Sequence, residues 1–195
     1  MKLTLKRKTY QTRRLVLRPY RETDFSTWRD VLSTALPKKT PQDWEAPPGQ
    51  KFTRQVFAQI KRRQEKAVDK GHFVWPIFIE KHNQFIGFVD VTVLIRDSIQ
   101  VANLGYRIDN RYWRKGFAKE AVSAMIKNAL VDLKLNRLEA VIDLDNKASI
   151  GLARAVGMKR EGIRRHYFYQ NGKWEDQVIF IATRANFGLP PLKLD

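Results

Sequence analysis

The sequence of 195 residues contains no cysteine. This absence excludes a disulfide framework, a cysteine-ligated metal and a cysteine nucleophile. Long apolar runs are also missing, since no stretch approaches the roughly 18 consecutive apolar residues of a membrane-spanning helix. The basic N-terminus, MKLTLKRK, is not followed by an apolar segment, so we expect no signal peptide. These absences predict a cytoplasmic protein with no metal ion and no membrane partner.

Acidic residues are few compared with basic ones. The chain has 37 Lys+Arg against 20 Asp+Glu, a formal net charge of +17. A field of that sign attracts polyanions such as nucleic acid, the ribosome or an anionic cofactor. The basic residues are spread along the chain, which favours a general electrostatic role over a dedicated binding arm. A basic protein without any polyanionic partner is the alternative.

Hydrophobic periodicity predicts alternating strands and helices. Strands are predicted at 10–20, 72–80, 84–95, 99–108, 137–144, 158–169 and 173–183. Helices are predicted from Thr23 or Asp24 to 35 and at 52–69, 116–135 and 146–156. Four prolines make 37–50 a loop. Gly157 is placed to end a helix in the left-handed conformation, and Asn171-Gly172 to form a hairpin turn.

These elements predict an α+β (mixed α/β) fold. We expect a single domain, residues 1–195, with a central mixed, mostly antiparallel sheet of about seven strands flanked by about four helices. The order is βααβββαβαββ, in which a β-meander precedes a strand–helix–strand crossover.

The segment LGYRIDNRYWRKGFAKEA, residues 104–121, carries the clearest chemical signal. It is a strand, a short basic loop and the start of a long helix, and helix N-termini bind anions. Gly116 allows close backbone approach, Ala118 keeps the next turn small, and Arg114 and Lys115 add positive charge. No P-loop or dinucleotide fingerprint is present. From the residues alone, a phosphate site and a glycine beside chance basic residues both remain open.

The stretch GYRI-x4-WRKGFA-x-EA resembles the acetyl-CoA-binding motif of the GNAT superfamily. It is most similar to the branch that includes the Rim-type ribosomal-protein N-terminal acetyltransferases. The similarity extends from Thr12-x-Arg14-Leu-x-Leu-Arg18, through Ile86-Gly87-Phe88 and Asn146-x-x-Ser149, to Asn171-Gly172. The resemblance implies transfer of an acetyl group from acetyl-CoA, the co-substrate, to a primary amine. The expected amine is the N-terminus of a protein, and ribosomal proteins are among the expected substrates.

The resemblance also implies residue roles. The amides from Arg114 to Ala118 would bind the pyrophosphate, with Trp113 where the general motif has Gln or Arg, and with Arg114 in place of a frequent glycine. Asn146 would contact the pantetheine, and Ser149 would give a proton to the leaving thiolate. Asn146 as a helix N-cap and Ser149 as a first-turn residue are the alternatives. The implied cofactor-binding residues are Tyr106, Arg107, Ile108, Arg114, Lys115, Gly116, Phe117, Ala118, Asn146 and Ser149.

No residue is an evident catalytic base. Phe168 and Asn103 stand where the similar enzymes have acidic residues, and neither side chain can accept the proton of an amine. His166 and Asp90 are the candidates that remain, although each is also explained as a solvent-facing strand residue. Glu120 is expected on the helix surface.

The acceptor site is expected in the segment 40–69. Trp44, Phe52 and Trp75 are candidates to line it, although Phe52 and Trp75 are equally well explained as core residues.

Several functions stay open beside acetylation of a protein N-terminus. They are acetylation of a small-molecule amine or an antibiotic, a non-catalytic acyl-CoA sensor, and an RNA- or ribosome-binding module on the same scaffold. The sequence has no dedicated RNA-binding signature, which counts against the last of these. Both a monomer and a homodimer fit the sequence. Transfer of an acyl group longer than acetyl fits it as well.

Overall fold

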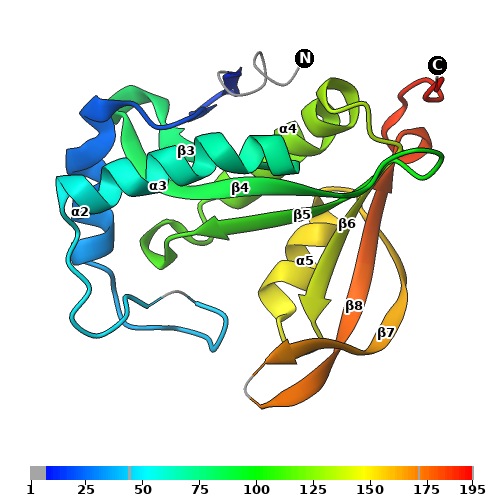
Figure 1. Ribbon diagram of the computed structural model, residues 1–195. Helices are drawn as coiled ribbons and strands as arrows, with labels where there is room; N and C mark the ends of the chain where they lie inside the picture. Colours follow the sequence, from blue (N-terminus) through cyan, green and yellow to red (C-terminus); the bar gives the residue numbers. More distant parts are fainter. Residues whose placement is uncertain (1–7, 44, 171, 195) are drawn as a thin grey trace. The chain divides into compact units, whose positions relative to one another are not determined.

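The computed structural model describes residues 8–43, 45–170 and 172–194, and these residues form four α-helices and eight strands. The elements in chain order are β1 (Tyr10–Gln11), β2 (Leu15–Leu17), α2 (Phe25–Ser33), α3 (Arg54–Ala67), β3 (His72–Ile79), β4 (Gln84–Ile95), β5 (Val101–Ile108), α4 (Phe117–Asp132), β6 (Arg137–Asp143), α5 (Lys147–Ala155), β7 (Lys159–Gln170) and β8 (Lys173–Thr183) (Figure 1). Short 3-10 turns lie between several of them. Each predicted helix is present, and so is each predicted strand apart from the first, which is replaced by two short strands.

The chain divides into two compact units, which are described separately. The first runs up to Asp90 and includes Tyr106–Ala124, and the second comprises Val91–Gly105 and the chain from Met125 onward. β4 and β5 each have residues in both units. The strand order is β1-β2-β3-β4-β5 in the first unit and β4-β5-β6-β8-β7 in the second. The β5–β6 pair is parallel, whereas the β1–β2, β2–β3, β6–β8 and β7–β8 pairs are antiparallel. The predicted α+β class with a mixed, mostly antiparallel sheet is confirmed.

A tight turn corrects the prediction of one strand at 10–20. Tyr10 pairs with Leu17, so the chain reverses between β1 and β2. Thr12 closes the turn, because its backbone N–H donates to the Leu15 carbonyl at 2.9 Å and its hydroxyl accepts from the Leu15 N–H at 3.0 Å. Threonine offers the backbone such local hydrogen bonds in competition with a strand ladder. Within the described part of the chain the sheet therefore has eight strands in place of about seven.

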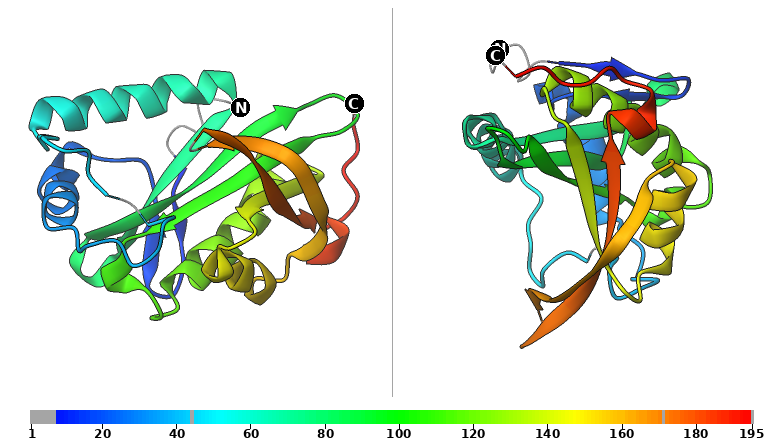
Figure 2. Two further views of the ribbon diagram at one scale, coloured as in Figure 1. Left: turned by 90° about the horizontal axis from the view of Figure 1, so that it is seen from below. Right: turned by 90° about the vertical axis from the view of Figure 1, so that its right-hand side faces the viewer.

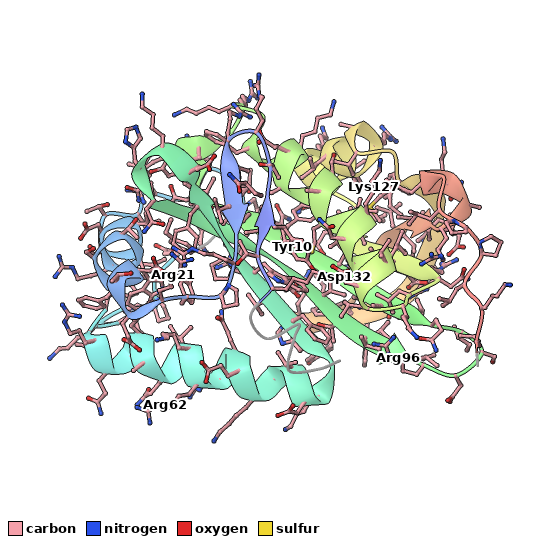
Figure 3. The ribbon with its side chains drawn as sticks, turned by 90° about the horizontal axis from the view of Figure 1, so that it is seen from above. Tyr10, Arg21, Arg62, Arg96, Lys127 and Asp132 are labelled. Atoms are coloured by element: carbon pink, nitrogen blue, oxygen red, sulfur yellow. The ribbon has the colours of Figure 1, made fainter. Side chains whose placement is uncertain are left out.

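A hydrophobic cluster, aromatic except for Val31 among its buried members, joins α2 and α3 to the sheet of the first unit. Figure 1 shows α3 running alongside β3 and β4. The buried members of the cluster are Phe25, Trp28, Val31, Phe57, Phe78 and Phe85. Each side chain of this size contributes about 1.5–3 kcal/mol when it is fully buried. The opposite side of α3 is polar, and Arg62 points away from the strands there (Figure 3).

Asp24, one of the two predicted starts of the first helix, uses its carboxylate to bind a buried arginine. Its carboxylate makes no capping bond to α2. It accepts two hydrogen bonds from the Arg18 guanidinium, at 2.7 and 2.8 Å, and one from the Arg21 N–H at 2.6 Å. Arg18 and Asp24 are both buried. The pair therefore joins the end of β2 to the start of α2 inside the core.

Gly87 brings β4 close to β5. Its φ is +150°, and a Cβ built there would lie 2.0 Å from the carbonyl oxygen of Arg107. Only glycine combines this backbone conformation with this approach. The irregularity lies within the strand that carries Phe88 and Asp90, next to the end of β5.

In the second unit β6 and β8 form a long antiparallel pair, and β7 and β8 form a twisted hairpin (Figure 2). Gly172 has the left-handed φ of +81° expected for the hairpin turn, while Asn171 lies outside the described residues. Gly157, with φ +89°, ends α5 as predicted. The β7 register shifts between Arg164 and Phe168, where His166 has a φ of +48°.

Candidate functional site

The segment after β5 turns sharply before α4 begins. The Asp109 carboxylate accepts hydrogen bonds from the backbone N–H of Arg111 at 3.1 Å and from its Nε at 2.7 Å. The indole Nε1 of Trp113 donates to the Ile108 carbonyl at 2.7 Å. The segment from Trp113 to Ala118 comprises a loop and the first two residues of α4, and is called the Trp113–Ala118 loop below. These contacts hold its beginning against the end of β5.

The backbone of this loop is suited to an anion. Arg114 and Gly116 have left-handed φ values of +59° and +78°. Backbone segments that alternate between left- and right-handed residues turn their N–H groups into a common concavity that binds anions. The first N–H groups of α4 add the positive end of the helix dipole. Because Arg114 and Lys115 are exposed cations beside these donors, the residues present fit a pyrophosphate.

The loop is supported by Arg14, which lies in the β1–β2 turn, and by Glu120, which lies on α4. The Glu120 carboxylate accepts from the Thr12 hydroxyl at 2.6 Å and from the Arg14 backbone N–H and Nε at 2.7 Å each. Arg14 in turn donates through Nη1 to the Lys115 carbonyl at 3.0 Å. The Glu120 side chain is only 16% exposed. The expectation that Glu120 is a helix-surface residue is wrong, because the β1–β2 turn covers it.

Gly116 has two reasons to be glycine. Its positive φ disfavours other residues, and a Cβ there would lie 3.2 Å from Arg14 Nη2. A larger side chain would therefore displace the guanidinium that holds the Lys115 carbonyl.

The predicted pantetheine-binding residues lie at the end of β5. In the second unit β5 pairs with β6 only from Val101 to Asn103. Tyr106, Arg107 and Ile108 lie beyond this stretch, in the first unit, with Ile108 buried. The Arg107 guanidinium lies over the Phe88 ring, 5.6 Å from its centroid.

A small, mainly apolar pocket is formed by α2, β4 and β5 in the first unit. Phe88 and Arg107 belong to it, and Asp43 brings a carboxylate from the loop after α2. The full lining is Val31, Leu32, Ala35, Leu36, Asp43, Phe85, Ile86, Gly87, Phe88, Arg107, Asp109 and Asn110.

Asn110 holds the proline-rich loop against the end of β5. Its Nδ2 donates to the Pro37 carbonyl at 3.0 Å and to the Asp43 carboxylate at 2.7 Å. The backbone carbonyl of Asn110 accepts a hydrogen bond from Lys39 Nζ at 3.4 Å. Asn110 is buried, and its Oδ1 has no hydrogen-bond partner among the described residues. Its place directly after a predicted strand was the one sign of this residue in the sequence.

A second, more open pocket adjoins the Trp113–Ala118 loop. It is lined by Leu36, Lys39, Thr40, Asn110, Arg111, Trp113 and Arg114. The Lys39 ammonium lies 5.9 Å from the centre of the Trp113 ring. Three cations and one aromatic side chain therefore surround this pocket.

The aromatic residues proposed for the acceptor site have mixed outcomes. Trp75 is a core residue, 1% exposed and stacked on Phe73 with ring centres 5.9 Å apart. Phe52 packs on Trp28, with ring centres 5.7 Å apart. Trp44 lies outside the described residues.

Asn146 and Ser149 lie in the second unit, at the start of α5. Asn146 Oδ1 accepts from the Ser149 backbone N–H at 3.0 Å, so Asn146 is the N-cap of this helix. The capping bond uses only the side-chain oxygen of Asn146, and the amide group keeps its two N–H donors for another partner. Ser149 is half-buried in the first turn.

The candidate bases have unequal surroundings. Asp90 lies 3.5 Å from His72 Nε2, and its side chain is 22% exposed. Burial raises the pKa of the Asp90 carboxyl above its ordinary value, although His72 and Arg107 act in the opposite direction. His166 is exposed on β7, and its backbone N–H donates to Asp176 at 2.9 Å. His72 was not anticipated from the sequence.

The described residues contain no group of three histidine, aspartate or glutamate side chains arranged to hold a metal ion. None of the helices in that part of the chain combines the length and apolar character that a bilayer crossing requires.

Comparison with known proteins gives a matching family and several relatives. Residues 14–159 match the family model described as an acetyltransferase (GNAT) domain. The "Probable N-acetyltransferase YjcK" of Bacillus subtilis (strain 168) is 33% identical over 126 residues, 64% of this chain and 70% of that protein. The [ribosomal protein uS5]-alanine N-acetyltransferase of Escherichia coli (strain K12) is 28% identical over 115 residues, which is 59% of either chain. Mycobacterium smegmatis RimJ, solved in complex with CoA-disulfide, superposes with a TM-score of 0.73 at 20% identity, covering 91% of this chain and 85% of that one.

Proposed function

Because the chain belongs to the GNAT acetyltransferase family and is an N-acetyltransferase, we propose that it transfers the acetyl group of acetyl-CoA to the N-terminal amine of a protein. The observation that carries the cofactor half of this proposal is the Trp113–Ala118 loop. Its left-handed residues Arg114 and Gly116 precede a helix N-terminus, and the loop is fixed from the other side by Arg14. We assign the whole chain, residues 1–195, to one catalytic domain.

The cofactor-binding residues are assigned along β5 and the start of α4. The backbone N–H groups from Arg114 to Ala118 bind the pyrophosphate, and the Arg114 and Lys115 side chains add charge. The end of β5 at Tyr106, Arg107 and Ile108 supplies backbone groups for the pantetheine arm, in the manner of a neighbouring strand. Phe117 packs the loop against Arg14, whose guanidinium lies 4.4 Å from the ring centre.

Asn146 and Ser149 are assigned to the thiol end of the cofactor. The Asn146 amide N–H groups are left for a pantetheine carbonyl by the capping geometry of α5. The Ser149 hydroxyl gives a proton to the thiolate when the C–S bond breaks, which stabilises the leaving group. His166, the other candidate base, lies exposed on β7, and its backbone N–H donates to Asp176.

A protein acceptor is supported by the relatives and by charge. The Escherichia coli relative is named as acting on the alanine of ribosomal protein uS5. The net charge of +17 suits a substrate on or near ribosomal RNA. Exposed cations also follow α3, at Arg54, Arg62, Arg63, Lys66 and Lys70. A ribosomal substrate would place the reaction in the cytoplasm.

The first test is a calorimetric titration of the protein with acetyl-CoA. Gly116→Glu places bulk and negative charge in the loop, and we expect binding to fall by at least 100-fold. Gly188→Glu is the matched control, because Gly188 also has a positive φ and a Cβ there meets nothing within 4 Å. Absence of binding by the folded wild type would overturn the assignment of the cofactor site.

The acceptor is tested by thiol release from acetyl-CoA with four probes. These are an alanine-first peptide, a serine-first peptide, spermidine and an aminoglycoside. We expect turnover with the peptides. Turnover confined to spermidine or the aminoglycoside would replace the protein acceptor with a small-molecule amine.

A further inference from the structure

A charged cluster crosses three strands of the first unit. Asp90 lies on β4, His72 on β3 and Arg107 on β5. His72 Nε2 is 3.5 Å from Asp90 Oδ2, and the positive charge of Arg107 also acts on the Asp90 carboxyl. The His72 side chain is 41% exposed, against 22% for Asp90. The cluster therefore leads from a partly buried carboxylate to a histidine in contact with solvent.

The cluster adjoins the pocket formed by α2, β4 and β5. Phe88 and Arg107 line that pocket. Asp43 also lines it, and its negative charge acts on Arg107. Alternate residues of a strand share a face, so Asp90 lies on the same face of β4 as Phe88. Asp90 is therefore the next residue on this face of β4 after Phe88, which lines the pocket.

Acetyl transfer needs a proton acceptor that the expected positions do not supply. A primary amine reaches the enzyme mainly as an ammonium ion and must lose a proton before it attacks. The resemblance implies acidic residues at the positions of Phe168 and Asn103, and neither of these two side chains can accept that proton. Phe168 is 53% exposed on β7. A carboxylate next to the pocket is chemically able to take this role.

We propose that Asp90 accepts the proton of the acceptor ammonium and that His72 passes it to solvent. This inference rests on the proposed acetyl transfer. The neutral amine nitrogen attacks the thioester carbonyl carbon, the C–N bond forms and the C–S bond breaks. The nitrogen loses two protons in all. One is released to solvent through Asp90 and His72, and the other balances the protonation of the thiolate to the free thiol.

The surroundings of Asp90 suit this role. Among the described residues, the charged or titratable groups that act on it are His72 from β3 and Arg107 from β5. Burial raises the pKa of the carboxyl, which brings its basicity closer to neutral pH, while His72 and Arg107 act in the opposite direction. A carboxyl with a raised folded-state pKa lowers the stability of the fold when ionised. The geometry that suits Asp90 to this role is its place on the strand face of Phe88, 3.5 Å from the solvent-accessible His72.

The test compares three variants with the wild type, using the probe with the highest turnover. Asp90→Asn removes the carboxylate and keeps its shape, and we expect kcat/KM to fall by about 100-fold or more. His72→Gln should reduce it by about 10-fold, because water can replace a relay. Asp97→Asn is the control, since Asp97 is an exposed carboxylate in the β4–β5 turn. Acetyl-CoA affinity, measured by calorimetry, should not change in any variant.

The pH profile separates a catalytic role from a structural one. Wild-type kcat/KM should rise as Asp90 deprotonates and then level off. In Asp90→Asn this step should disappear, and the rate should rise with the deprotonation of the amine itself. Asp90→Glu should restore part of the activity, and Asp90→Asn should not lower the unfolding midpoint. Asp90→Asn activity within threefold of wild type, with an unchanged profile, would overturn the proposal. Wild type that binds no acetyl-CoA would instead overturn the proposed function.

Discussion

Glu120 offers the sharpest test of how the cofactor loop is held. Its carboxylate accepts hydrogen bonds at 2.6, 2.7 and 2.7 Å from Thr12 and Arg14. A hydrogen bond of this kind contributes about 1 kcal/mol net, and more when one partner is charged. Arg14 is 34% exposed, which weakens the ionic part, and alanine favours the helix by a few tenths of a kcal/mol. We therefore expect Glu120→Ala to lower the free energy of unfolding by about 2 kcal/mol.

The same change should weaken acetyl-CoA binding. Without Glu120, Arg14 is no longer fixed below the Lys115 carbonyl, and the loop must be ordered when the cofactor binds. We expect an affinity loss of about 10-fold, equivalent to about 1.4 kcal/mol. Urea unfolding and calorimetry measure the two effects. Lys119→Ala is the matched control, because Lys119 is the exposed neighbour on α4.

The pH dependence gives an independent check on Glu120. Burial alone would raise its pKa, but the hydrogen bonds from Thr12 and Arg14 lower it below the ordinary value of 4.5. A carboxyl with a lowered folded-state pKa stabilises the fold above its unfolded pKa and loses this effect as the pH falls through the folded value. The stability difference between wild type and Glu120→Gln should thus shrink below about pH 4.5. A difference under 0.5 kcal/mol for Glu120→Ala at neutral pH would refute the reasoning.

Three further changes probe other parts of the molecule. Gly87→Ala should lower the free energy of unfolding by about 3 kcal/mol or more in urea, because the new Cβ meets the Arg107 carbonyl at 2.0 Å, whereas Gly162→Ala, with open space around it, should change it by less than about 1 kcal/mol. Arg114→Gly should not lower the melting temperature, since it relieves a φ of +59°, yet it should weaken acetyl-CoA binding in calorimetry through the lost charge. Asp24→Ala should cost about 3–5 kcal/mol in urea unfolding, since it leaves a buried arginine unpaired; an effect below 1 kcal/mol would contradict the buried pair.

The order of the long elements follows from local patterns. The apolar positions of α4 and α5, the glycine after α5 and the alternating strands each depend on residues close in sequence. The position of the Trp113–Ala118 loop follows from the same order, because it is the segment between a strand and a long helix. The prediction at residues 10–20 is wrong because one threonine side chain bonds to the backbone and reverses the chain.

The α+β class, the element order and the basic loop at the start of α4 follow from the sequence alone. These depend on periodicity, turn residues and helix-end chemistry, which act over a few residues. Only the tertiary structure placed Glu120 under the β1–β2 turn, Asn110 against the proline-rich loop, and His72 beside Asp90. In each case the two partners are at least 18 residues apart, so burial and charge at one depend on where the fold brings the other.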